Sequence, residues 1–104
     1  MTINRFDVKD PSEKVTLTFD FSAGLSSEEM LSGVPVALVS MAFGTDPAPS
    51  AILNGSASID PTLKLVFVPV QAGIADCDYV VKVVVPTSNA SKVLALSAIL
   101  PVRA

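Results

Sequence analysis

The chain has no histidine, no tryptophan and a single cysteine, Cys77, among its 104 residues. One cysteine cannot form an internal disulfide, and without histidine the thiol lacks the base that usually activates a nucleophilic cysteine. The neighbouring Asp76 and Asp78 place negative charge beside the thiol, which opposes formation of a thiolate. We therefore expect Cys77 to be a structural residue, and we expect no cysteine–histidine metal site.

Charged residues are also scarce, at 16% of the chain against about 25% in ordinary domains. The net charge is −3, and the basic residues are scattered singly instead of forming the stripe that nucleic acid requires. Between Leu31 and Gly73 the only charged residues are Asp46, Asp60 and Lys64. A lone domain distributes charge over its whole surface, so we interpret this stretch as surface covered by neighbouring proteins. A plain Val/Ala-rich sandwich is the alternative.

Long apolar runs are missing as well. No run approaches the roughly 20 residues of a membrane-spanning helix, and residues 1–10 are too polar and charged for a signal peptide. We therefore expect no membrane partner and synthesis in the cytoplasm.

What the sequence does contain is alternation with a period of two. In residues 14–22, Val15, Leu17, Phe19 and Phe21 alternate with polar residues, which is typical of a half-buried strand. The dipeptide Asn54-Gly55 suits a two-residue type I′ hairpin between residues 51–53 and 56–59. The remaining predicted strands have the same character: 34–43, 62–70, 79–85 and 92–100.

About seven short strands with regular turn signals predict an all-β, antiparallel sandwich. We place a single domain at residues 14–104, preceded by an N-terminal arm at residues 1–13 that could add as an edge strand. Ser26 and Glu29 have capping-box spacing, which predicts a short helical turn near residues 26–32. Tyr79 begins a late strand after a glycine-containing turn and resembles the tyrosine corner of immunoglobulin-like sandwiches, in which the hydroxyl bonds to backbone a few residues upstream.

Candidate chemical sites are few. Asp76 and Asp78 are too few oxygen ligands for Ca²⁺ unless Asp46 or Asp60 joins them from other loops, so we favour loop capping over metal binding. Glu28 and Glu29 are adjacent and point in different directions, which suits charges at a helix start better than paired acid–base catalysts. There is no glycine-rich phosphate loop, and we expect neither a cofactor nor enzymatic activity.

Two segments carry a family resemblance. The first reads KDPSE at residues 9–13, followed by the alternating strand and SAGL at 22–25. The second reads DY at 78–79, then a valine-rich strand, TS at 87–88 and LSAILPVR at 96–103. In order and spacing these segments resemble the phage fibre–tail adaptor family, small immunoglobulin-like proteins of tailed-phage virions.

The resemblance implies a non-enzymatic virion protein in the tail or neck region, made in the bacterial host cytoplasm. Such an adaptor links tail fibres to the tail through contacts with other virion proteins, as a homo-oligomeric ring. The candidate docking residues that it implies are Phe6, Lys9, Asp10, Pro11 and Arg103. Capsid decoration or carbohydrate adhesion on the same scaffold remains the alternative, although the loops at 44–50 and 86–91 lack the aromatic residues of an adhesion site.

Overall fold

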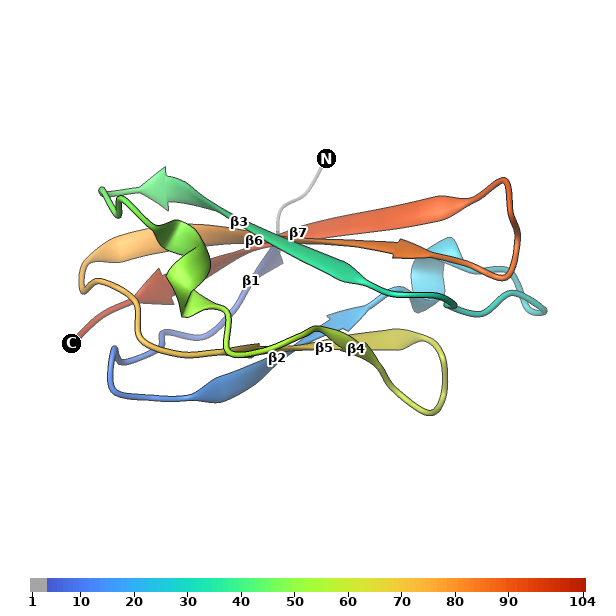
Figure 1. Cartoon of the computed structure of the whole chain (residues 1–104), viewed down its shortest axis with the longest axis horizontal. Coiled ribbons are helices and arrows are strands. Elements are labelled where there is room, and N and C mark those ends of the chain that lie inside the picture. The colour runs from blue at the N-terminus through green and yellow to red at the C-terminus, as the bar shows by residue number, and fades with distance from the viewer. Residues whose placement is uncertain (1–3) are drawn as a thin grey trace.

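The computed structural model describes residues 4–104 and is all-β, with two sheets packed face to face (Figure 1). One sheet has the strand order β1-β7-β6-β3, and the other has the order β2-β5-β4. All pairs are antiparallel except β1 with β7, which is parallel. The strands are β1 Asn4–Arg5, β2 Val15–Asp20, β3 Val36–Phe43, β4 Ser58–Ile59, β5 Leu65–Val70, β6 Cys77–Pro86 and β7 Val93–Val102.

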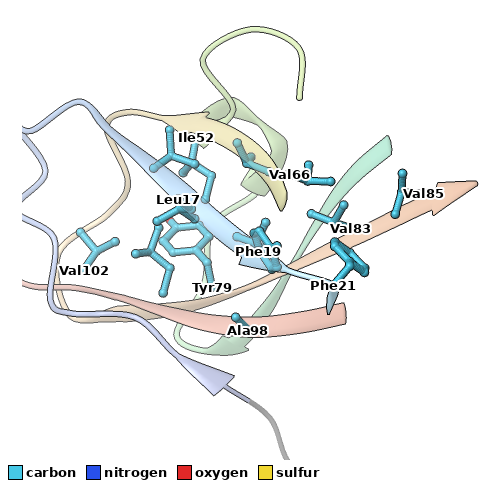
Figure 2. Packing of buried hydrophobic residues seen from close by; sticks show 14 of the residues in the cluster. Leu17, Phe19, Phe21, Ile52, Val66, Tyr79, Val83, Val85, Ala98 and Val102 are labelled. Atoms are coloured by element: carbon cyan, nitrogen blue, oxygen red, sulfur yellow. The ribbon is translucent and has the colours of Figure 1, made fainter. Parts of the chain in front are cut away.

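The core lies between the sheets and follows the predicted alternation. Leu17 and Phe19 of β2 are buried while Thr16 and Thr18 are exposed, which confirms the first predicted strand. On β6, every second side chain from Tyr79 to Val85 has no exposed surface, and Figure 2 shows Tyr79 beside Leu17 and Phe19. Burying one such valine contributes about 1.5–3 kcal/mol relative to leaving it exposed, so the core depends heavily on β6.

The helical turn predicted near residues 26–32 is present only in its first part, where the Ser26 amide donates to the Glu29 carboxylate at 2.9 Å as the capping-box spacing predicts. Residues 26–29 form a single turn in which the Glu29 amide donates to the Ser26 carbonyl at 3.0 Å. The chain then extends, because the Leu31 amide donates to the Leu63 carbonyl at 2.8 Å and Leu31 pairs with Thr87. The two short 3₁₀ helices lie elsewhere, η1 at Ser22–Gly24 and η2 at Pro49–Ile52.

The hairpin predicted at Asn54-Gly55 is wrong. Leu53 pairs with Val70, and β4 pairs with Phe67 and Val66, so the chain runs along β5 instead of reversing. Gly55 has a φ of +103°, whereas Asn54 does not have the positive φ that a type I′ turn needs at both positions. The Asn54 amide instead donates to the Pro69 carbonyl at 2.9 Å.

The predicted arm runs along β7 as an edge strand. Beyond the two residues of β1, the Phe6 amide donates to Ile99 and the Lys9 amide donates to Pro101, at 2.9 and 3.0 Å. Residues 4–9 therefore share a sheet with the C-terminal strand. None of the helices in the described part of the chain is long and apolar enough to cross a membrane.

Candidate interaction surface

Tyr79 has the hydrogen bond that the sequence predicted. Its hydroxyl accepts from the Ile74 amide, five residues upstream, at 2.9 Å, and donates to Oδ2 of Asp46 at 2.7 Å. Burial, together with the bond to Asp46, raises the pKa of Tyr79 to about 12. The hydroxyl therefore ties the loop after β3 and the turn before β6 to the same core residue.

Lys9 is buried inside the domain. The residue is only 2% exposed. Its Nζ donates to the carbonyl of Ala72 at 2.6 Å and to the carbonyl of Asp10 at 2.9 Å. Burial lowers its pKa from the ordinary value. In this conformation the ammonium fastens the arm to the turn before β6 and is not accessible to a partner.

The other arm candidates have structural contacts of their own. The ring of Phe6 packs edge-on against Phe19, with centroids 5.4 Å apart. Oδ1 of Asp10 accepts from both the amide and the hydroxyl of Ser12, and these bonds lower the pKa of Asp10. Pro11 is half-buried in the same turn. The arm is thus a set of internal contacts in which Asp10 and Pro11 retain exposed surface.

Arg103 lies in an ion cluster at one end of the four-stranded sheet. It donates to Oδ1 of Asp78 at 2.8 Å and to the carbonyls of Cys77 and Val102. Arg5 lies 3.7 Å from the other oxygen of Asp78. From the sequence, Arg103 was a docking candidate and Asp78 a loop-capping carboxylate. In the structure the two side chains form one ion pair.

The side chains considered as metal ligands or nucleophiles are not arranged as a chemical site in the described part of the chain. Among the described residues, no three His, Cys, Asp or Glu side chains lie together as metal ligands. Cys77 is buried beneath Gly44, where an added Cβ would lie 2.5 Å from its sulfur. Because Gly44 also has a φ of +85°, both space and backbone require glycine there.

Glu29 joins two distant turns. Its carboxylate accepts from Lys92 at 2.6 Å, from the Asn89 amide group at 3.0 Å and from the Ser26 amide at 2.9 Å. These bonds, the one from Lys92 above all, lower the pKa of Glu29 to about 2. The bond from Ser26 is the one that capping-box spacing predicted. The bonds from Lys92 and Asn89, which hold residues 26–29 against the β6–β7 loop, had no signal in the sequence.

The largest unexplained feature is the outer face of the four-stranded sheet. The ion cluster of Arg5, Asp78 and Arg103 lies at one end of this face. Between that cluster and the β6–β7 loop, strand register places ten outward side chains of β3, β6 and β7, of which Lys82 is the only charged one. Val36, Leu38 and Val93 are 50%, 52% and 62% exposed. We call this set the outer face: Val36, Leu38, Ser40, Val80, Lys82, Val84, Val93, Ala95, Ser97 and Ile99.

The charge-poor stretch of residues 31–73 is even less charged at its surface than its sequence indicates. Asp46 accepts a hydrogen bond from the Tyr79 hydroxyl, as described above. Asp60 is buried and accepts from the hydroxyl of Thr62 and from the amides of Thr62, Lys64 and Leu65. Two of the three charges in this stretch therefore satisfy internal groups.

A shallow groove of about 270 Å³ lies between the arm and β2. Val8 and Val15 line it together with Asp7, Glu13 and Thr16, so its lining is mixed and has no convergent set of polar groups. It is a weaker candidate for recognition than the outer face.

No protein-family model, curated protein or solved structure matches this chain.

Proposed function

We propose that this chain is a non-enzymatic structural protein of a phage virion, an adaptor in the tail or neck that links tail fibres to the tail. The observation that carries the proposal is the outer face, on which Val36, Leu38 and Val93 are at least half exposed and Lys82 is the only charged member. Contiguous exposed apolar surface marks protein–protein contact sites. An adaptor working in symmetric copies covers such surface with its neighbours.

The strand order supports an immunoglobulin-like scaffold for this adaptor. In immunoglobulin constant-type domains one sheet has strands ABED and the other CFG. Here β2-β5-β4 corresponds to BED, and β3, β6 and β7 correspond to C, F and G. The tyrosine at the start of β6, bonded to backbone upstream, occupies the place of the tyrosine corner.

The engagement of the polar groups supports assembly over catalysis. Glu29, Asp60, Asp78 and Lys9 hold turns, strands and the arm in place. A catalytic group instead needs to face a substrate pocket with a shifted pKa matched to its task. These four side chains stabilise the fold, which is consistent with a domain whose exposed apolar surface contacts neighbouring proteins.

The test is quantitative proteomics of purified phage particles whose genome encodes this sequence. A fixed low copy number, on the order of six or twelve as closed tail symmetry requires, supports the adaptor. Copy numbers in the hundreds would instead indicate capsid decoration. Absence from the particle would overturn the virion assignment altogether.

A further inference from the structure

The two sheets have four edges, and β3 is the least protected of them. β1 and β3 border the four-stranded sheet, and β2 and β4 border the three-stranded one. β1 and β4 have two residues each within the described chain, β2 has six and β3 has eight. Natural edges avoid pairing with other chains by being short, charged, proline-bearing or bulged.

Charge and length separate β3 from the other edges. Arg5 lies in β1 and Asp20 lies in β2, whereas β4 is only two residues long. From Val34 to Thr45 the sequence has no charged residue, and Pro35 precedes the strand instead of interrupting it. β3 therefore lacks both the charge and the short length that protect the other edges.

Local structure limits the accessible part of β3 to its first five residues. A register shift lies between Met41 and Phe43, and η2 packs against the strand near its C-terminal end (Figure 1). The segment Val36–Ser40 precedes both features. On it, Val36, Leu38 and Ser40 point to the outer face, and Ala37 and Val39 point toward the core.

We propose that a second copy of this chain pairs with this segment, antiparallel and about a two-fold axis near Leu38. The two four-stranded sheets then continue into one, with the outer faces side by side. Such an isologous contact opposes each residue with another uncharged residue, so no like charges meet across the seam. Leu38 of each copy, now 52% exposed, lies against its counterpart.

The position of Lys82 favours this arrangement over stacking of two outer faces. Stacking would bury each Lys82 ammonium against apolar surface, which is costly because the carboxylate that β6 places on this face, Asp78, is already paired with Arg103 and Arg5. In edge pairing, the two lysines stand three strand spacings apart, about 14 Å. This separation exceeds the Debye length of about 10 Å at moderate salt, so their repulsion is largely screened.

The contact area predicts a weak, concentration-dependent dimer. Five paired residues span about 16 Å, well short of the roughly 800 Å² per partner in a standard interface. The half-exposed Val36 and Leu38 add apolar area along the seam. The inference depends on this strand alone and holds or fails independently of the proposed virion role.

The experiment is sedimentation equilibrium and native mass spectrometry of the purified chain over a wide concentration range. We expect a dimer whose fraction rises with concentration. Leu38→Lys should weaken it by about tenfold or more, because like charges then oppose each other across the seam. Val93→Lys is the matched control: it adds the same charge to the same face, on the distant strand β7, and should dimerise as the unmodified chain does.

Hydrogen exchange of the same samples identifies the contact. Amides within residues 36–40 should gain protection as the dimer forms, while residues 80–84 should not change. Should Leu38→Lys fail to fold by circular dichroism, Val36→Lys replaces it. A chain that stays monomeric at its highest soluble concentration would overturn the proposal, as would equal loss of dimer in both lysine variants or unchanged exchange at 36–40.

Discussion

The two faces of the four-stranded sheet have similar sequences and opposite environments. Along β6, Val81 and Val83 point inward and have no exposed surface, whereas Val80 and Val84 point outward and are partly exposed. Hydropathy does not distinguish these valines. The three-stranded sheet covers only one face, so a residue's side of the sheet, and not its type, decides whether it belongs to the core.

The sharpest test of this comparison is one substitution made on each face. Val83→Ala should destabilise the fold by about 2–3 kcal/mol, because it removes buried methyl groups and leaves a cavity. Val36→Ala, on a residue 50% exposed, should change the free energy of unfolding by about 0.5 kcal/mol or less in the monomer. Urea denaturation at low protein concentration measures both. Equal losses would mean that the outer face is as tightly packed as the inner one.

Tyr79 extends the comparison of the two faces to a polar group, because it is the inward residue of β6 that carries a hydroxyl. Tyr79→Phe should cost about 1–2 kcal/mol, because the Ile74 amide and the Asp46 carboxylate both lose their partner. Thermal unfolding, with Val36→Ala as the neutral reference, gives the value. A change within experimental error would show that the hydroxyl does not anchor these loops.

The smallest expected effect lies outside the two faces, at Glu29. The pKa of its carboxyl falls from an ordinary 4.5 to about 2 in the fold, so folding favours the ionised form. Its stabilising contribution is therefore complete above about pH 4.5 and is lost as the pH falls toward about 2. Glu29→Gln should lower stability at neutral pH and flatten the acid-induced decline in this window.

Glu28→Gln, on the exposed neighbouring residue, is the control for Glu29. Unfolding midpoints measured from pH 6 down to the acid limit compare the two variants. If both flatten the profile alike, the bonds of Glu29 to Lys92 and Asn89 do not account for it.

Strands with a clean alternation were predictable from sequence. β2 and β6 have inward residues two apart, and a period of two has only one regular structural solution. The prediction at Asn54-Gly55 failed, and the one at residues 26–32 held only for its first turn, because both used local preference alone. After Asn54 the chain pairs along β5 instead of turning back on itself. At Leu31 the carbonyl of Leu63 takes the amide that a continuing helix would have bonded to Ser27.

The proposed contact surface was only partly predictable. Scarcity of charge between residues 31 and 73 indicated a covered surface, and β3 does supply part of the outer face. The burial of Lys9 had no signal in the sequence, because it depends on the Ala72 carbonyl 63 residues away. The ion cluster of Arg103 and Asp78 likewise depends on the antiparallel register of β6 with β7.

The parallel pairing of the arm with β7 has a mechanical consequence. A pull between the two ends of the chain draws the arm toward its N-terminus and β7 toward its C-terminus, in opposite directions along a shared axis. The bonds from Phe6 to Ile99, from Lys9 to Pro101 and from Arg103 to Lys9 lie across that axis. Such a load shears these bonds together instead of unzipping them one by one, so a domain built this way resists tension best along the line of its own termini.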